Sequence, residues 1–331
     1  MFFIRKKVFI LFFVIFLIYV MVLIFSLLWG SQFLNIYELF SRQEDTLMLV
    51  KFRFMRIATA FLVGGSLSLA GCVYQAVLRN PLAEPYILGV SSGASLGVAL
   101  SFITGMAALS VYTVPGFAVA GAVLILAMVL LYGSAGKGTE SLLLAGVIAG
   151  TIASGLLVTI LSFADSSEIS SVFWFLLGDL SSADPALFRL FAILVPVISI
   201  LLCLLSPKSN ILALGNEYAW SMGLDPLKMT LIFVGLASLL AAMSAALAGI
   251  IGFAGLIIPH IIRKCSFYDN RVLFPASFFS GGVFLTLCDL VSRTLISQRE
   301  IPVGVITALL GGPLFLWILH HKKSSSAGSM Q

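Results

Sequence analysis

The segment GVSSG at residues 89–93 matches the G-x-S-x-G pattern that surrounds a serine nucleophile. A hydrolase built on Ser91 needs a base, and His260 is a candidate for that role. The pattern serves catalysis where the serine stands on a sharp turn between a strand and a helix. Here it opens an apolar run rich in glycine and serine, and such residues commonly let membrane helices pack. We therefore predict no catalytic residue, and keep a membrane-embedded serine hydrolase as an alternative.

The segment GSAGKGTES at residues 133–141 resembles a phosphate-binding loop, but its order is wrong. A P-loop requires Ser or Thr directly after its lysine, whereas Gly138 follows Lys137. No other segment of the sequence has the pattern. If ATP drives transport through this protein, we expect another polypeptide to hydrolyse it.

Asp289 is the one ionisable residue well inside an apolar run, and Arg293 follows it four residues later. That spacing places both side chains on one face of a helix, where they can form an ion pair. A carrier driven by protons or sodium would be expected to show more carboxylates inside its apolar runs. An ion-coupled secondary carrier is therefore a second alternative, which this composition does not favour.

The composition predicts an all-α protein that crosses a membrane many times. Hydrophobic residues make up 60% of the 331 residues and charged residues only 10%, and the mean hydropathy is +1.12. Apolar stretches of about 20 residues suit a hydrocarbon core of roughly 30 Å. The four cysteines stand singly, without C-x-x-C spacing, so we predict neither a disulfide framework nor a metal site. Basic residues beside spans account for the net charge of +5, so we predict no nucleic-acid partner.

Nine apolar stretches are evident, and a tenth is predicted. The nine occupy residues 8–29, 57–78, 86–106, 113–133, 141–163, 186–205, 229–251, 273–292 and 302–320. Both ends of the chain are basic, which favours two cytoplasmic ends and hence an even number of spans. The run 229–262 would form a helix of about 51 Å, too long for one crossing, and GIIGFAG at 249–255 supplies a break. We predict about ten spans in one transmembrane domain covering residues 1–331.

The predicted topology is consistent with the distribution of charge and with one repeated pattern. Lys and Arg are more frequent in the segments assigned to the cytoplasm, which include the turn after Arg79. The pattern S-x-x-L-A-G occurs at 66–71 and again, five spans later, at 244–249, as expected for two inverted halves. It also occurs at 141–146, so simple helix packing is the alternative explanation.

Six segments together resemble the FecCD family, the permeases of type II ABC importers for ferric siderophores, haem and cobalamin. The resemblance runs from about Arg53 to the C-terminus. The segments are AGCVYQAVLRNPLAEPYILGVSSGASLG (70–97), LLLAG (142–146), LALGNEYAWSMGLDP (212–226), GFAGLIIPHIIR (252–263), DLVSR (289–293) and EIPVGVITALLGGPLF (300–315). One departure is Met55, which stands where the family usually has a proline between two arginines.

The resemblance implies a permease domain of the bacterial cytoplasmic (inner) membrane that imports its cargo by alternating access. The cargo would be a chelated iron compound, either a ferric siderophore or haem, or else cobalamin. The implied partners are a second permease copy, identical or closely homologous, two cytoplasmic ATPase subunits and an external substrate-binding protein. Magnesium and ATP would bind the ATPase subunits, so no cofactor is expected in this chain.

The resemblance also implies a binding-protein docking site and a gate. Basic residues at Arg53, Arg56 and Arg293 would grip acidic residues of the binding protein. Asn80, Pro81 and Leu82 would form a cytoplasmic turn that lines the inner gate of the pathway, and glycines in residues 89–97 would let the third span pack closely. For the arginines the alternative is interaction with lipid headgroups, or a simple pair between Arg293 and Asp289.

The long cytoplasmic loop 206–228 is the third implied site. Its apolar residues are interrupted by two glycines, which suggests two short helices. By resemblance it would dock the ATPase subunit, with tight turns at Gly215 and Gly223 and with Leu214 and Ala219 facing a groove on the partner. The alternative is an amphipathic segment resting on lipid.

Overall fold

The computed structural model describes residues 2–30, 44–134, 139–181, 184–296 and 300–327. These ranges contain helices and turns and no strand, which confirms the all-α fold. The helices are α1 (Phe2–Leu28), α2 (Glu44–Val77), α3 (Val90–Ile103), α4 (Thr113–Ser134), α5 (Thr139–Leu161), α6 (Ser166–Leu177), α7 (Pro185–Ala213), α8 (Asn216–Ser221), α9 (Pro226–Ala248), α10 (Ala254–Lys264), α11 (Asn270–Thr294) and α12 (Val303–Ala327). Residues 135–138 of the segment that resembles a P-loop lie outside the described ranges.

The ten predicted spans all fall on helices. Seven described helices are long and apolar enough to cross a membrane, namely α1, α2, α4, α5, α7, α9 and α11. Two shorter apolar helices occupy Val90–Ile103 and Val303–Phe315, within α3 and α12. The segment predicted to return after GIIGFAG is α10. The S-x-x-L-A-G pattern therefore does recur five spans apart, in α2 and at the end of α9, and the inversion of the two halves stays a prediction.

Aspartate caps explain why several helices begin where they do. The Asp184 carboxylate accepts hydrogen bonds from the backbone N–H groups of Ala186 and Leu187, and Pro185 occupies the first turn of α7. Asp225 caps α9 in the same way, through the N–H of Lys228. An Asp-Pro pair satisfies an otherwise unpaired donor and presets the first helical dihedral angle, so each span starts at a defined residue.

The structure adds one helix to the prediction and moves another boundary. No span was predicted between residues 163 and 186, and the structure adds α6 there, begun by a capping box between Asp165 and Glu168. We also expected two short helices in the loop 206–228. The prediction of a first short helix is wrong, because α7 continues to Ala213 with Pro207 inside it. Only the second, α8, is a separate short helix.

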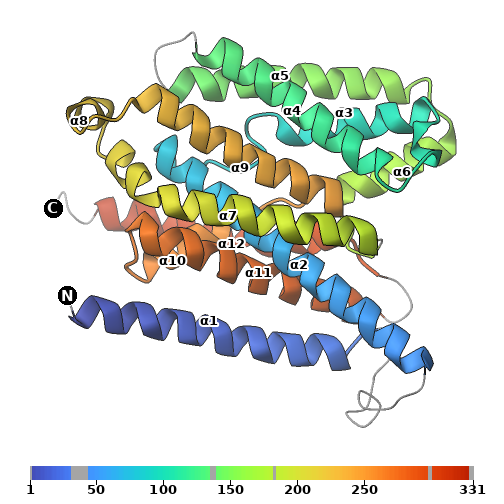
Figure 1. The fold of residues 1–331 in the computed structure, drawn as a ribbon, viewed down its shortest axis with the longest axis horizontal. Helices are drawn as coiled ribbons and strands as arrows, with labels where there is room; N and C mark the ends of the chain where they lie inside the picture. The colour runs from blue at the N-terminus through green and yellow to red at the C-terminus, as the bar shows by residue number, and fades with distance from the viewer. Residues whose placement is uncertain (1, 31–43, 135–138, 182–183, 297–299, 328–331) are drawn as a thin grey trace.

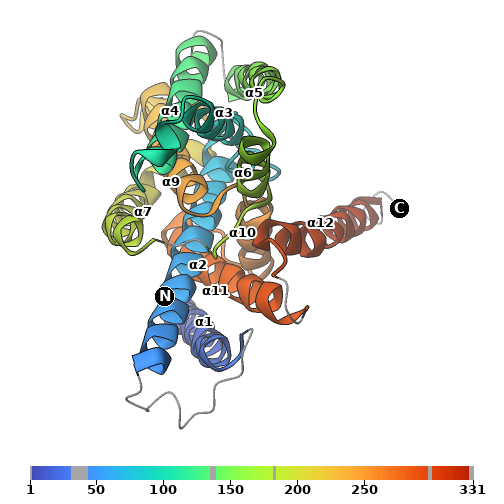
Figure 2. The ribbon, with the colours of Figure 1, turned by 90° about the vertical axis from the view of Figure 1, so that its right-hand side faces the viewer.

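Helix α2 lies at the centre of the bundle, with α7, α9, α10 and α11 around it (Figures 1 and 2).

Glycines let the backbones of neighbouring helices approach closely. A methyl group on Gly71 of α2 would collide with the carbonyl oxygen of Gly255 in α10. A methyl group on Gly97 of α3 would likewise collide with the carbonyl oxygen of Phe117 in α4, so the predicted close packing of the third span is confirmed.

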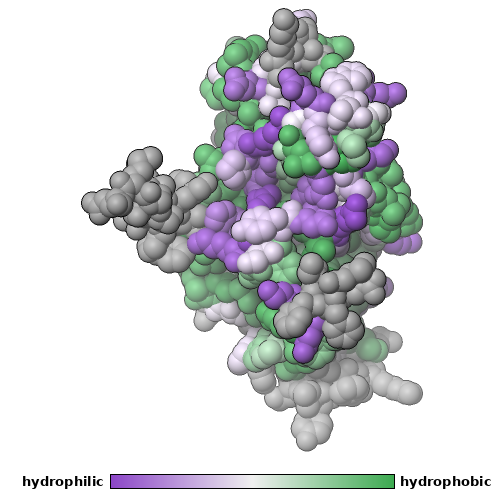
Figure 3. Space-filling view, turned by 90° about the vertical axis from the view of Figure 1, so that its left-hand side faces the viewer, coloured by the Kyte–Doolittle hydropathy of each residue, from purple (hydrophilic) through white to green (hydrophobic). Residues whose placement is uncertain are grey.

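The two ends of the bundle carry different elements. The start of α1, the end of α12 and the short helix α8 all lie at one end, on the left in Figure 1, as an even number of crossings requires. We call this the inner end, and its assignment to the cytoplasm stays a prediction from the basic residues. Seen face on, it shows hydrophilic side chains gathered across the middle and hydrophobic ones at the flanks (Figure 3). The opposite, outer end carries the first turns of α2 and the last turns of α11 (Figure 1).

Candidate functional site

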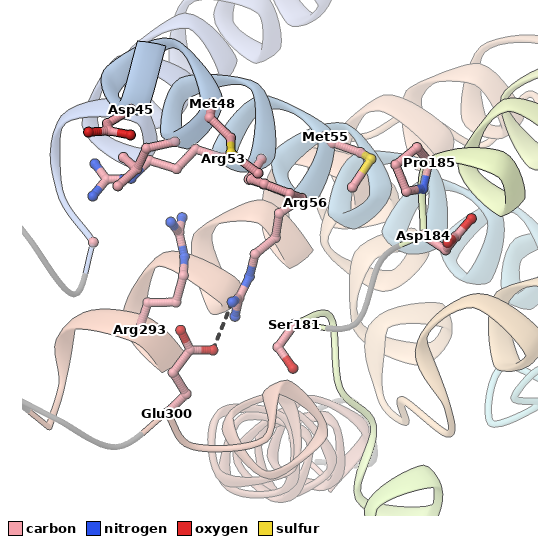
Figure 4. A pocket seen from close by; sticks show the side chains of 13 residues that line it. Asp45, Met48, Arg53, Met55, Arg56, Ser181, Asp184, Pro185, Arg293 and Glu300 are labelled. Carbon is pink, nitrogen blue, oxygen red and sulfur yellow. Dashed lines mark hydrogen bonds and ion pairs between the residues drawn. The ribbon is translucent and has the colours of Figure 1, made fainter. Parts of the chain in front are cut away.

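The outer end brings together all three arginines of the predicted docking site. Arg53 and Arg56 lie near the start of α2, and Arg293 lies in the last turn of α11, which packs along α2. Asp289 lies one turn before Arg293, and Glu300 lies three residues before the start of α12. We call these five residues the outer charge cluster (Figure 4 shows four of them).

Ion pairs link most of the outer charge cluster. Arg56 places Nε 2.9 Å from Asp289 Oδ1 and Nη1 2.7 Å from Glu300 Oε2. On the other side of the same carboxylate, Arg293 Nε lies 3.0 Å from Asp289 Oδ2. Asp289 is therefore shared between two guanidinium groups, and the pairing of Asp289 with Arg293 predicted from their spacing is confirmed.

Most of the cluster is withdrawn from solvent. Asp289 is fully buried, and Arg53 and Arg293 are only 7% and 6% exposed. Arg53 donates from Nη1 to the carbonyl oxygens of Leu27 and Leu28, at 2.7 and 3.3 Å. A cation placed on the last carbonyls of a helix is electrostatically favourable, so Arg53 ties the end of α1 to α2.

A cavity of about 730 Å³ opens beside the cluster, and its walls carry charges of both signs (Figure 4). Its lining residues come from the start of α2, the start of α7, the end of α11 and the segments next to them: Gly30, Asp45, Met48, Leu49, Phe52, Arg53, Met55, Arg56, Ser181, Asp184, Pro185, Arg293 and Glu300. The Glu300 side chain is 41% exposed, and the Arg56 side chain only 14%. A carboxylate entering this cavity would meet Arg56 where Glu300 now pairs with it.

The predicted gate residues form a compact turn after α2. Asn80 Oδ1 accepts a hydrogen bond from the backbone N–H of Leu82 at 2.9 Å, and the N–H of Ala83 reaches the Asn80 carbonyl at 3.1 Å. This is the local turn that asparagine followed by proline favours. Leu82 is left 46% exposed, so the turn presents an apolar side chain at its surface.

The predicted docking loop has the turns that were expected, with one correction. Gly215 and Gly223 bracket α8 with φ angles of 126° and 75°, a region that favours glycine. Leu214 is 67% exposed, as docking requires. Ala219, however, is fully buried within the chain and cannot face a partner. Ala219 is the one buried residue of α8, and the exposed large apolar side chains of this helix and its flank are Tyr218, Trp220 and Met222.

Comparison with known proteins identifies the family. Residues 15–321 match the model of the FecCD transport family. The vitamin B12 import system permease protein BtuC of Shigella boydii serotype 18 is 36% identical over 297 residues, which is 90% of each chain. The BtuC of Salmonella arizonae is 37% identical over 294 residues, 89% of each chain. The chain belongs to the FecCD transport family.

Solved structures agree with this assignment. A chain described as an inward-facing metal-chelate type ABC transporter superposes with a TM-score of 0.87, at 29% identity, over 94% of this chain and 99% of that one. PsaBC from Streptococcus pneumoniae shares the fold, with a TM-score of 0.59 at 18% identity over 82% of this chain and 92% of that one. The FecCD chain is thus the permease subunit of a type II ABC importer, a multi-pass protein of the bacterial cytoplasmic membrane.

The serine pattern has a packing role in this FecCD protein. Gly89 caps α3 with a φ of 75°, and Ser91 lies in the first turn of that helix after a turn rather than a strand. Ser92 receives a hydrogen bond from Ser154 of α5 at 3.2 Å. The strand–turn–helix elbow that a nucleophilic serine needs is therefore absent at Ser91.

Among the described residues, no group of three or more His, Cys, Asp or Glu side chains could hold a metal ion.

One polar contact, made by Glu84 of the segment 70–97, was not predicted from the sequence. Glu84 Oε1 accepts a hydrogen bond from the backbone N–H of Phe253 at 2.7 Å. Phe253 stands before α10 with a φ of 68°, in the broken segment between α9 and α10. Glu84 thus ties the segment between α2 and α3 to the start of α10. A charged residue between two prolines in an apolar sequence was the available signal that Glu84 has a structural role. Its partner could not be predicted, because Phe253 lies 169 residues away.

Proposed function

We propose that this permease moves a preassembled metal chelate into the cytoplasm by alternating access, with cobalamin as the first candidate and a ferric siderophore or haem as the others. The observation that carries the proposal is the match to the FecCD family over residues 15–321, together with relatives that are named for vitamin B12 import. The neighbouring structure described as a metal-chelate type transporter supports the same class of cargo.

The proposed assembly contains a second permease copy, two cytoplasmic ATPase subunits and an external binding protein. The exposed side chains around α8 support an ATPase contact at the inner end, and the cavity beside Arg56 supports a contact with acidic side chains at the outer end. Helices α5 and α12 lie on the same side of the bundle (Figure 2) and expose leucines, including Leu144 and Leu309, that either lipid or a second copy could cover.

Reconstitution tests the proposed function. The purified permease should hydrolyse no ATP alone, and ATP hydrolysis should appear when the ATPase subunits are added. Vesicles that contain the complete complex should accumulate labelled cobalamin, a ferric siderophore or haem only with ATP and the binding protein present. Uptake driven by a proton or sodium gradient without ATP would instead establish an ion-coupled carrier. Robust hydrolysis by the permease alone would also contradict the proposal.

The gate at Asn80, Pro81 and Leu82 leads to a second prediction. Because Leu82 is exposed at the surface of its turn, two copies of the permease could bring these turns together across a central pathway. A cysteine at residue 82, in a background without the four native cysteines, should cross-link between the two copies in one nucleotide state and not in another. Cysteine at the exposed Met222 of the docking loop serves as the control. Equal cross-linking in every nucleotide state, or none in any, would remove Leu82 from the gate.

A further inference from the structure

Arg79 connects the docking loop to the gate turn through three hydrogen bonds. It follows the end of α2, and Asn80 of the gate turn is the next residue. Its guanidinium donates from Nε and Nη2 to the carbonyl oxygen of Leu212, at 3.1 and 2.7 Å, and from Nη2 to Asn216 Oδ1, at 2.6 Å. These partners lie 133 and 137 residues further along the chain.

The two partners stand on either side of Gly215, in the short connection between α7 and α8. Leu212 lies in the last turn of α7, where its carbonyl oxygen also accepts the N–H of Gly215 at 3.2 Å and where the end of a helix favours a cation. Asn216 is the first residue of α8, and Gly215 lies between the two helices with a φ of 126°. One guanidinium therefore fixes the angle at which α8 leaves α7.

The backbone of Arg79 also points to a positional role. Its φ is 51°, in the left-handed region that non-glycine residues rarely adopt. Such a conformation persists where surrounding contacts hold it, and the three side-chain hydrogen bonds are contacts of that kind. A change at Leu212 or Asn216 would thus reach the backbone immediately before Asn80.

Other hydrogen bonds anchor the same loop away from the gate. Asn210 bonds to the Asp269 carboxylate at 2.7 Å and to the Asn270 N–H at 3.0 Å, and Ser209 bonds to the Asn270 side chain at 2.9 Å. These bonds hold the end of α7 against the start of α11. In the part of the chain that the structure describes, Arg79 supplies the side-chain hydrogen bonds between this loop and the gate turn.

We propose that Arg79 is a positioning residue that transmits movement of α8 to the gate turn at residues 80–82. The proposal rests on the proposed function, in which α8 meets the ATPase and the turn gates the pathway. ATP-driven displacement of α8 would pull on the Asn216 contact, while the Leu212 carbonyl holds the guanidinium at the end of α7. Arg79, the residue that precedes Asn80, would carry the displacement into the gate turn. Without the link, the ATPase could turn over while the gate responds poorly.

The test compares uptake and ATP hydrolysis in the reconstituted complex. Arg79→Asn is the main variant, because asparagine tolerates a positive φ but is too short to reach Leu212 or Asn216. We expect assembly and ATP hydrolysis to stay near wild type. Uptake should fall about tenfold, a factor that corresponds to about 1.4 kcal/mol. The amount of ATP consumed per chelate transported therefore rises. Arg79→Lys, with a shorter reach and one ammonium group, should recover part of the coupling. Arg271→Asn removes another exposed arginine near the inner end and should leave the ratio unchanged.

A second measurement does not depend on transport. Asn216→Ala removes the α8 contact without touching the gate turn, and hydrogen exchange is followed in the permease alone in lipid nanodiscs. We expect faster exchange at the amides of Leu82 and Ala83, although the altered residue lies far away in sequence. Unchanged exchange there, or an unchanged ATP-to-chelate ratio in Arg79→Asn, overturns the link. Loss of assembly in Arg79→Asn would overturn it too, by showing a purely structural anchor. Failure of the wild-type complex to transport would count against the proposed function, and the exchange result would still decide the role of Arg79.

Discussion

Replacing Asp289 with alanine is expected to destabilise the permease by about 3–5 kcal/mol, the typical effect of leaving buried charge unpaired. Asp289 is fully buried and is shared by Arg56 at 2.9 Å and Arg293 at 3.0 Å. Without the carboxylate, Arg293 would keep its positive charge at 6% exposure and lose its ion-pair partner. The measurement is the amount of monodisperse permease that survives heating in detergent, compared with wild type.

Two variants show whether the effect comes from unpaired charge. Glu300→Gln removes a partner of Arg56 whose side chain is 41% exposed, so it should cost less than about 1 kcal/mol. Asp289→Leu combined with Arg293→Leu removes the buried pair together and should regain much of the stability lost in Asp289→Ala. Wild-type stability in Asp289→Ala would contradict the prediction, because it would mean that water reaches both guanidinium groups.

The sequence predicted the spans well because their signal is local. Each long apolar run must satisfy its backbone hydrogen bonds inside itself, so length and composition suffice to find it. The return of the chain at GIIGFAG could be predicted for the same reason, since 229–262 is too long for one straight crossing. Helix α6 escaped notice because its 12 residues are too few to span a membrane and mix serine with phenylalanine. Its capping box between Asp165 and Glu168 was the available signal.

The site contacts likewise differ in whether they could be predicted, according to how far apart in the sequence the residues lie. The pair between Asp289 and Arg293 follows from a spacing of four, whereas Arg56 meets its two carboxylates across 233 and 244 residues. No local pattern gives such contacts, and only the family resemblance grouped Arg56 with Arg293. Ala219 shows that the family resemblance also has a limit. A resemblance suggested that it faces a partner, but which face of a short helix is buried depends on the body that it packs against.

The predicted docking of the binding protein should respond in opposite directions to changes at two paired residues. An acidic side chain that enters the outer cavity would compete with Glu300 for Arg56, which now pairs with Glu300 at 2.7 Å. Arg56→Gln should weaken association with the binding protein about tenfold or more, because it removes the cation while leaving a donor for Asp289. Glu300→Gln should strengthen association a few-fold, because it removes the competing carboxylate.

Titration of the binding protein onto permease in nanodiscs, at low and high salt, measures both effects. Wild-type association should weaken as salt rises, because screening shortens to about 8 Å at physiological ionic strength. Arg189, exposed near the start of α7 and outside the residues that line the cavity, supplies the matched control, and Arg189→Gln should change affinity little. Each variant is first checked for wild-type thermal stability, so that a loss of binding is not a loss of fold. If Arg56→Gln and Arg189→Gln weaken association equally, the effect is general electrostatic attraction. If Glu300→Gln weakens association instead, the Arg56–Glu300 pair itself belongs to the docking surface, and competition for Arg56 is ruled out.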